Sequence, residues 1–278
     1  MRYLKEVISS RELLANLTLR EIRGKYKRTV FGQLWSLVNP IATMLIYTFV
    51  FFFIFRVQPD AGDPSGLDVF PLWLLCGLLP WTFLANVTNQ GLLSLVNNQN
   101  LIQKVYFTRV ALPLSIVGAT GFNWLFEMGV LAVALSIFGA FVLPWLPFVL
   151  LTMVLLAVFA TGLALLLSIA NVHFRDTQYL VTIVLQIWMY LTPIIYPVSL
   201  VKAQSDAVGG LFSTSIHLLD IYRLNPMYHF VEVFRQLLYD NRWPDLTNVL
   251  AAAAWTAAVF AAGLAVFRHN ERNLAEAL

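Results

Sequence analysis

The sequence predicts an all-α integral membrane protein that crosses the bilayer six times. Hydrophobic residues make up 59% of the 278 positions and charged residues only 12%, about half the charged share of a soluble globular chain. Glu127 alone lies well inside an apolar stretch, and every other charged residue lies in a loop, at an edge or in a tail. A soluble fold could not cover that much apolar surface.

Six apolar stretches account for the crossings, because a membrane-spanning helix needs about 20 mostly apolar residues. An even number of crossings places both termini on one side of the membrane. No repeat or soluble domain interrupts the pattern, so we expect one six-span membrane domain over 33–278, preceded by a cytoplasmic segment over 1–32. The predicted spans are residues 33–55, 70–93, 110–141, 148–170, 179–196 and 248–267.

The distribution of basic residues predicts the orientation. If the termini are cytoplasmic, the inner segments hold thirteen of the 18 Lys and Arg residues. The outer segments then hold Arg56, Lys202, Arg223, Arg235 and Arg242. Basic residues in short loops and tails favour the cytoplasmic side, so we expect a multi-pass protein of the cytoplasmic (inner) membrane with both termini inside the cell.

The segment 9–32 combines leucines at helical spacing with basic residues and predicts a short amphipathic helix on the inner leaflet. Two interpretations are open. The helix is an ordinary juxtamembrane anchor, or it also rests on a cytoplasmic partner. Its basic residues are Arg20, Arg23, Lys25, Lys27 and Arg28.

The fifth apolar stretch contains Pro193 and, shortly after it, Pro197. Proline removes a hydrogen-bond donor and clashes with the preceding turn, so we expect this helix to kink or end near the outer face. Residues 226–239 follow with apolar groups at helical spacing, Pro226 at the first helical position and Asn225 as the cap. Fourteen residues are too few to span a bilayer, which favours a re-entrant or interfacial helix.

The sequence contains no motif for ATP hydrolysis. The phosphate-binding loop GxxxxGK[ST] is absent, since Gly24-Lys25 is followed by Tyr26 and lacks the upstream glycine. Glu127 alone offers a membrane proton site, but without a second ionisable group in the apolar stretches it is better explained as a neutral or hydrogen-bonded group near a helix interface.

Catalytic and metal sites also have little support. The single cysteine, Cys76, lies in an apolar run and is expected to be a small buried hydrophobe. The histidines at 173, 217, 229 and 269 are scattered, and neither HExxH nor CxxC occurs. His229 and Glu232 lie three residues apart on one predicted helix, which keeps a membrane-embedded transferase as a minor alternative.

Aromatic residues are abundant, with 21 Phe, ten Tyr and eight Trp. Such residues ordinarily anchor a protein at the membrane interfaces. Flat rings also stack on the apolar faces of sugars, so a pore that conducts a glycan would use the same residues. The sequence alone does not separate these two interpretations.

Three stretches together resemble the permease subunit of polysaccharide and polyol-phosphate exporters in the ABC-2 class of ATP-binding-cassette transporters. They are KYKRTVFGQLWSLVNP at 25–40, NVHFRDTQYLVTIVLQIWMYLTPIIYP at 171–197 and LNPMYHFVEVFRQLLY at 224–239. Members of this family carry lipid-linked O-antigen, capsular polysaccharide, teichoic acid or galactan from the inner to the outer face of the cytoplasmic membrane. The resemblance covers nearly the whole chain.

The resemblance implies that other subunits supply the ATPase activity. It implies a homodimer bound to two copies of a separate ATPase subunit, which bind ATP and Mg, whereas this chain holds no cofactor or metal and no nucleic acid. It also implies contact with membrane lipid and a lipid-linked glycan substrate. Two other functions remain as alternatives, an ABC-2 permease for small hydrophobic molecules or lipids and, with less support, a membrane-embedded enzyme.

The resemblance further assigns roles to residues. The N-terminal amphipathic segment becomes an interface helix, the loop 97–109 a coupling helix that sits in a cleft of the ATPase, and the region between spans five and six a pair of re-entrant outer gate helices. The first and fifth spans of two copies line the pore. The coupling residues are Gln99, Asn100, Gln103, Lys104 and Tyr106; the candidate channel residues are Tyr47, Phe51, Trp188, Tyr190 and Tyr196; the outer gate residues are Asn225, Pro226, Tyr228, Glu232 and Arg235.

Overall fold

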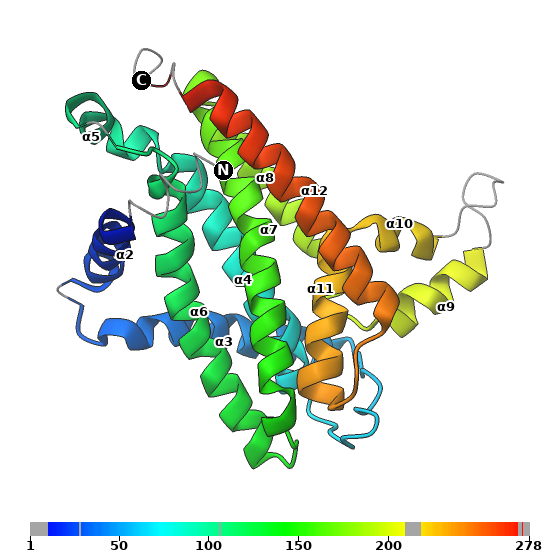
Figure 1. Cartoon of the computed structure of the whole chain (residues 1–278). Helices are drawn as coiled ribbons and strands as arrows, with labels where there is room; N and C mark the ends of the chain where they lie inside the picture. Colours follow the sequence, from blue (N-terminus) through cyan, green and yellow to red (C-terminus); the bar gives the residue numbers. More distant parts are fainter. Residues whose placement is uncertain (1–10, 28, 106, 209–217, 272–273, 275–278) are drawn as a thin grey trace.

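The computed structural model describes residues 11–27, 29–105, 107–208, 218–271 and 274, and this part of the chain contains helices and no strand (Figure 1). Two predicted site residues, Arg28 and Tyr106, lie outside the described residues. The helices are α2 (Arg11–Tyr26), η1 (Gly32–Leu34), α3 (Trp35–Tyr47), η2 (Thr48–Ile54), α4 (Phe70–Leu93), η3 (Val96–Asn98), α5 (Gln99–Lys104), α6 (Ala111–Ile137), η4 (Leu143–Trp145), α7 (Leu146–His173), α8 (Thr177–Tyr190), α9 (Val198–Val208), α10 (Leu218–Leu224), α11 (Pro226–Arg235), η6 (Gln236–Asp240) and α12 (Leu246–Asn270).

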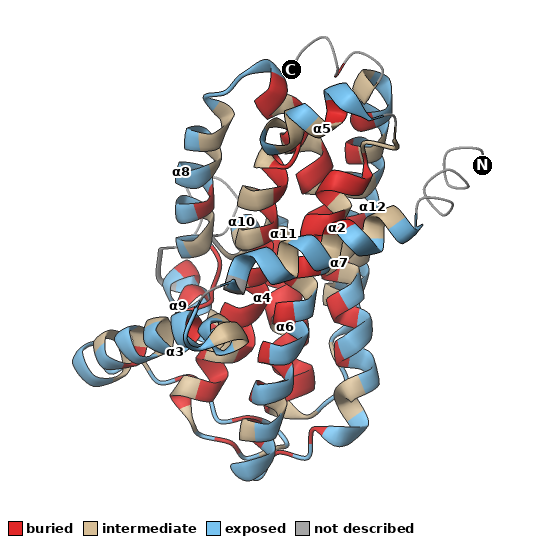
Figure 2. Cartoon of the chain, turned by 90° about the vertical axis from the view of Figure 1, so that its left-hand side faces the viewer, coloured by how far each residue is buried: buried red, intermediate tan, exposed pale blue. Residues whose placement is uncertain are grey.

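Helices α4, α6, α7, α11 and α12 form the bundle, and buried residues concentrate along their facing sides (Figure 2). The helix α4 is at its centre, with buried side chains on all sides from Phe70 to Leu92. A helix that is apolar all round has no polar face to present to water, which explains why α4 is covered by its neighbours.

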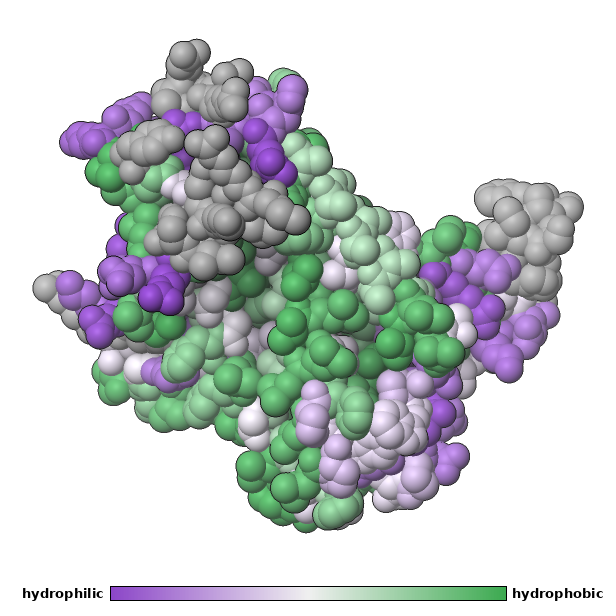
Figure 3. Space-filling model, in the orientation of Figure 1, coloured by the Kyte–Doolittle hydropathy of each residue, from purple (hydrophilic) through white to green (hydrophobic). Residues whose placement is uncertain are grey.

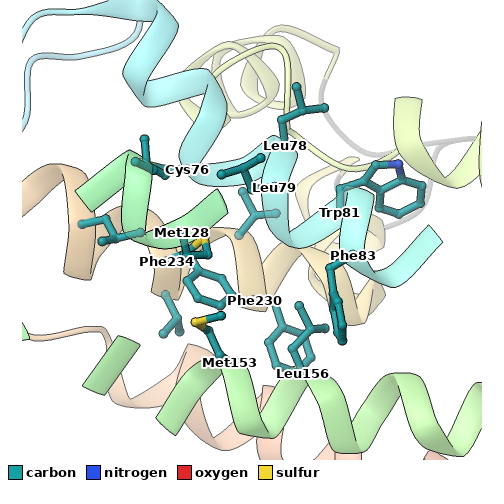
Figure 4. Packing of buried hydrophobic residues seen from close by; sticks show 14 of the residues in the cluster. Cys76, Leu78, Leu79, Trp81, Phe83, Met128, Met153, Leu156, Phe230 and Phe234 are labelled. Atoms are coloured by element: carbon teal, nitrogen blue, oxygen red, sulfur yellow. The ribbon is translucent and has the colours of Figure 1, made fainter. Parts of the chain in front are cut away.

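The core of the bundle consists of aliphatic, aromatic and sulfur-containing side chains (Figure 4). The ring of Phe83 stacks on that of Trp124 with centroids 4.1 Å apart, and Phe159 contacts Phe230 at 5.7 Å. Cys76 is completely buried among these residues, as expected from its apolar neighbours in the sequence.

Small residues allow the long helices to approach closely. A methyl group added at Gly263 would lie 2.3 Å from the Gly162 carbonyl oxygen, and one added at Gly162 would lie 2.7 Å from the Phe260 backbone. The pair Gly91 and Ala164 brings α4 equally close to α7. Small-residue contacts of this kind are typical of helix packing in membranes.

Helices α7 and α12 run in the same direction. At one end Ile169 and Val172 share an apolar cluster with Phe267, and at the other end Trp145 contacts Trp243 with centroids 5.3 Å apart. Because α7 ends where α12 also ends, residues 174–245 must cross the molecule once from one end to the other. They do so in pieces, with α8 near one end and α11 near the other (Figure 1).

Five helical segments are long and apolar enough to span a membrane within the described residues: Gly32–Ile54, Phe70–Leu93, Ala111–Ile137, Leu143–His173 and Leu246–Asn270. They correspond to five of the six predicted spans. The predicted fifth span is a helix of 14 residues, roughly 21 Å long, and is too short alone to cross a hydrocarbon core of about 30 Å.

Two helices on the periphery expose large apolar surfaces. The segment Gly32–Ile54 is only 11% buried, and α3 runs across the direction of α6 and α7 (Figure 1). Helix α8 buries Leu185 alone, while Tyr179, Ile183 and Ile187 along it are exposed. Hydrophobic residues also cover the middle of the molecule on the face shown in Figure 3, with polar residues toward its margins.

Candidate functional site

The candidate site is built around the end of α8, where the helix stops and buried turns follow; we call this segment the break after α8. Helix α8 ends at Tyr190, three residues before Pro193, and buried turns follow from Thr192 to Ile195. The two prolines prevent the helix from continuing. The predicted kink or end near Pro193 is therefore confirmed, although α8 ends at Tyr190, before the predicted end of the span at residue 196.

The side chain of Arg235, which is 5% exposed, holds this break in place. Its Nη1 donates to the Pro193 carbonyl over 2.6 Å and its Nη2 to the Ile194 carbonyl over 2.7 Å. These carbonyls lie beyond the end of α8 and have no helical partner there. The fork of a guanidinium group suits two adjacent acceptors, so Arg235 joins α11 to the end of α8.

Helix α4 completes the surroundings of Arg235. The guanidinium carbon lies 3.6 Å from the centroid of the Trp73 ring, a cation–π geometry. A methyl group at Gly77 would lie 3.2 Å from Nη2, so the glycine makes room for the charge. Glu232 lies one turn earlier on α11, with its Oε1 3.7 Å from Nη1. In the sequence, a glycine within an apolar helix, Gly77, could have indicated that another group approaches α4 closely. Nothing in the sequence indicated the contact between Trp73 and Arg235.

Asn225 links the same break to the start of α11. Its Oδ1 accepts from the backbone N–H of Met227 over 3.0 Å, which confirms it as the predicted cap. The same oxygen accepts from the indole N–H of Trp188 over 2.6 Å, and its amide donates to Thr192 Oγ1 over 2.8 Å. Asn225 is therefore a junction between the end of α8 and α11.

The predicted channel residues divide into two groups. The Tyr47 hydroxyl lies 3.9 Å from Met189 Sδ and interacts with Tyr190, so the first span contacts α8 through two of the predicted residues. Phe51 packs edge-on against Tyr47, with centroids 6.1 Å apart. The structure thus brings Tyr47, Phe51 and Tyr190 together.

Trp188 and Tyr196 form the second group and contact other helices. Trp188 packs edge-on against Trp81 of α4, in addition to its bond with Asn225. The Tyr196 hydroxyl donates to the Tyr190 carbonyl over 2.6 Å and lies 2.9 Å from the Tyr222 hydroxyl. These two residues tie the break to α4 and α10.

The remaining residues of α11 have structural contacts. Tyr228 and His229 are buried, whereas Pro226 and Glu232 are half-buried. The Nδ1 of His229 lies 2.9 Å from Asn248 Oδ1 and its Nε2 lies 2.8 Å from the Arg223 carbonyl. Both ring nitrogens are therefore engaged, which argues against acid–base catalysis with Glu232. No cluster of metal-binding side chains occurs in the described part of the chain.

A reciprocal pair of hydrogen bonds fixes the turn between η6 and α12. Gln236 Nε2 donates to Asp245 Oδ2 over 2.7 Å, and the backbone N–H of Asp245 donates to Gln236 Oε1 over 2.9 Å. Nearby, burial raises the pKa of Asp240, and the hydrogen bond from Arg242 opposes that rise.

The predicted coupling helix is the short helix α5, at the end of the molecule where α7 and α12 end (Figure 1). Asn100, Gln103 and Lys104 are exposed, and Gln99 is half-buried. Ile102 on the other side is buried in an apolar cluster shared with Leu17 of α2. Helix α5 therefore presents polar side chains outward and is anchored to the long helices by Ile102, with Leu101 packed against the same cluster.

Helix α2 lies against α6 and contacts the start of α5. A methyl group added at Gly118 would lie 3.1 Å from Thr18, and Arg20 donates to Asn98 Oδ1 over 2.9 Å. The predicted basic residues Arg23, Lys25 and Lys27 are exposed. Lys25 interacts electrostatically with Glu127 of α6, so the isolated membrane carboxylate has a cationic neighbour that the sequence did not indicate.

Comparison with known proteins identifies related sequences. The family model for the ABC-2 type transporter matches residues 12–206. An O-antigen export system permease protein RfbA of Myxococcus xanthus is 28% identical over 280 residues, covering 100% of both chains. One of Klebsiella pneumoniae is 30% identical, covering 83% of this chain and 81% of the relative. The polysialic acid transport protein KpsM of Escherichia coli is 25% identical, covering 93% of each.

Proposed function

Because the chain belongs to the ABC-2 type transporter family, we propose that it is the membrane permease subunit of an ATP-driven polysaccharide exporter. Its cargo is a lipid-linked polymer of the O-antigen, capsule, teichoic acid or galactan type, moved from the cytoplasmic to the outer face of the inner membrane. The observation that carries this proposal is the full-length similarity to an O-antigen export permease. The relatives found are named as polysaccharide export proteins. None of them supports the alternative of a permease for small hydrophobic molecules or lipids, or that of a membrane-embedded enzyme.

The assembly is a homodimer with two ATPase subunits. This chain has no phosphate-binding loop, so energy must enter from another protein. Exposed apolar side chains on α3 and α8, including Leu45 and Ile183, need a cover of lipid or protein. A second copy at these helices would place Tyr47, Phe51 and Tyr190 between the two chains.

The six-span topology is part of the proposal, with both termini cytoplasmic. Five crossings are single helices, and the remaining one is divided between α8 and α11 because residues 174–245 pass from one end to the other. In this arrangement α11 has the role of the outer gate, and Asn225 and Arg235 hold it to the break after α8. Non-helical backbone at membrane depth is tolerated where protein satisfies it, as these side chains do.

Coupling follows the contacts between α5, α2 and the long helices. The exposed face of α5 enters the ATPase, and Ile102 and Leu17 in one apolar cluster transmit its movement to α6, α7 and α12. The bond from Arg20 to Asn98 makes the interface helix move with α5. ATP binding then changes the spacing of the two permeases, and aromatic rings hold the polymer loosely enough to release it.

Co-purification tests the subunit assignment. The tagged chain is isolated from its native membrane, and we expect an ATPase subunit to accompany it. Lys104→Glu reverses a charge on the exposed face of α5 and should release this partner, whereas Lys202→Glu on α9 should not. A chain that transports polymer without any ATPase would contradict the proposal.

A further inference from the structure

Two adjoining polar cavities lie where α2 crosses α4 and α6. Their volumes are about 470 and 300 Å³, and Glu21 and Gln90 line both of them. Volumes in this range are typical of sites for small ligands. We call them together the α2 cavity. Its polar side chains include Arg20, Glu21, Lys25, Gln90, Thr120 and Asn123.

The inner wall of the α2 cavity requires a hydrogen-bond donor. Asn123 is 4% exposed, and its Oδ1 has no hydrogen-bond partner among the described residues. Glu127 lies one turn further along α6 and is 8% exposed. A buried acceptor without a donor is costly. A ligand that carries N–H groups to this wall would donate the hydrogen bond that Asn123 Oδ1 lacks among the described residues.

The charges around the α2 cavity have both signs. Arg20 and Lys25 contribute positive charge from α2 and Glu21 contributes negative charge, with Arg20 Nη2 and Glu21 Oε1 in an ion pair 2.7 Å apart. A lining that carries charges of both signs suits a zwitterionic ligand. No aromatic ring is among the described residues that line either cavity, so the stacking platform for a sugar is missing.

We propose that the α2 cavity binds the headgroup of an ethanolamine phospholipid from the inner leaflet. The ammonium group donates toward Asn123 and Glu21, and the phosphate lies near Arg20 and Lys25. This inference rests on the proposed function, because that function places α2 on the inner leaflet. The bound lipid holds the interface helix against α4 and α6, beside the contact from Arg20 to Asn98 that leads to α5.

Native mass spectrometry of the full chain, purified and stripped of lipid in detergent, tests the proposal. Equal amounts of dioleoyl phosphatidylethanolamine, phosphatidylcholine and phosphatidylglycerol are added separately. We expect the ethanolamine lipid to bind about tenfold more tightly than the choline lipid, because a quaternary ammonium has no N–H to donate. Equal binding of these two lipids, or tightest binding of the anionic glycerol lipid, would overturn the proposal.

Variants locate the site. Asn123→Leu keeps the side-chain size and should reduce the tenfold preference to about twofold or less. Glu21→Gln changes a half-buried residue of the lining and removes the charge of its partly exposed ion pair with Arg20, a kind of pair that contributes little to stability; it should weaken the preference as well. Glu12→Gln makes the same change on an exposed part of α2 outside the cavity, and should leave the preference intact.

A full preference in both Asn123→Leu and Glu21→Gln would place the lipid elsewhere and overturn the assignment. The assay needs neither ATPase nor polymer, so its failure is distinguishable from a failure of the proposed function. Normal export in cells depleted of the chain, with lipid selectivity of the purified chain retained, would contradict the transport role alone.

Discussion

Two residues of α11 carry more of the structure than their position on a short helix suggests. Asn225 combines a helix cap with bonds to Trp188 and Thr192, and Arg235 donates to two carbonyls in the break after α8. Each residue satisfies backbone or side-chain groups that would otherwise be buried without partners. Substitutions at these positions should therefore affect α11 and the break after α8 through several lost contacts at once.

Arg235→Met should destabilise the protein by about 3 kcal/mol, because it leaves the Pro193 and Ile194 carbonyls without donors. Thermal unfolding in detergent measures the loss. Arg242→Met is the matched control, since Arg242 is 43% exposed and its ion pair with Asp240 lies at the surface, where such pairs contribute less than about 1 kcal/mol. Equal effects of the two variants would refute the role of Arg235.

Trp188→Phe should cost about 1 kcal/mol, because it removes one hydrogen bond and keeps the ring packed on Trp81. Asn225→Ala should cost more, since it removes the cap as well. In the double variant the losses should be less than additive, because both single changes delete the same bond. Additive losses, measured by the same unfolding assay, would show that this bond contributes nothing.

At the scale of the helix, the sequence predicted which helices exist and where they begin and end, provided that their apolar residues were continuous. The predicted span 70–93 coincides with α4, and Asn225 and Pro226 marked the start of α11 correctly. The length of α8 was overestimated, because the stretch remains apolar beyond the point where Pro193 ends the helix. Apolar composition continues through buried turns as readily as through a helix, so it does not report where helical hydrogen bonds stop.

The contacts of the candidate site were largely beyond prediction. Arg235 contacts Trp73 and the break after α8, and Lys25 interacts electrostatically with Glu127, across long separations in the chain. Such pairs depend on how helices pack, which periodicity does not encode. The crossing of Gly162 and Gly263 is a similar case, since neither glycine identifies its partner.

Gly263→Val should separate α7 from α12, because its side chain would overlap the Gly162 carbonyl. Overpacking of this kind costs about 1–3 kcal/mol, visible as a lower unfolding temperature. Gly129→Ala on α6 meets no atom within 4 Å and should be neutral or slightly stabilising, since alanine favours the helix. If Gly263→Val were equally well tolerated, the close crossing would be wrong.

At the scale of the molecule, the exposed apolar helices α3 and α8 are the proposed contact with a second copy. Ile187→Cys on the exposed face of α8 should form disulfide-linked dimers under mild oxidation, because Cys76 is buried and does not compete. Leu151→Cys on α7, which is also exposed, is the control and should remain monomeric. If gel electrophoresis detected dimers for Leu151→Cys and none for Ile187→Cys, the proposed interface at α8 would be wrong.

The proposed transport role connects all three scales, since in that proposal α5 receives energy, the bundle transmits it and the aromatic residues meet the cargo. The most direct test is to deplete the chain in its native cell and measure on which side of the inner membrane the lipid-linked polysaccharide accumulates. We predict accumulation on the cytoplasmic face, with surface polymer lost. Normal surface polymer after complete depletion would contradict the assignment as a polysaccharide exporter and favour another cargo.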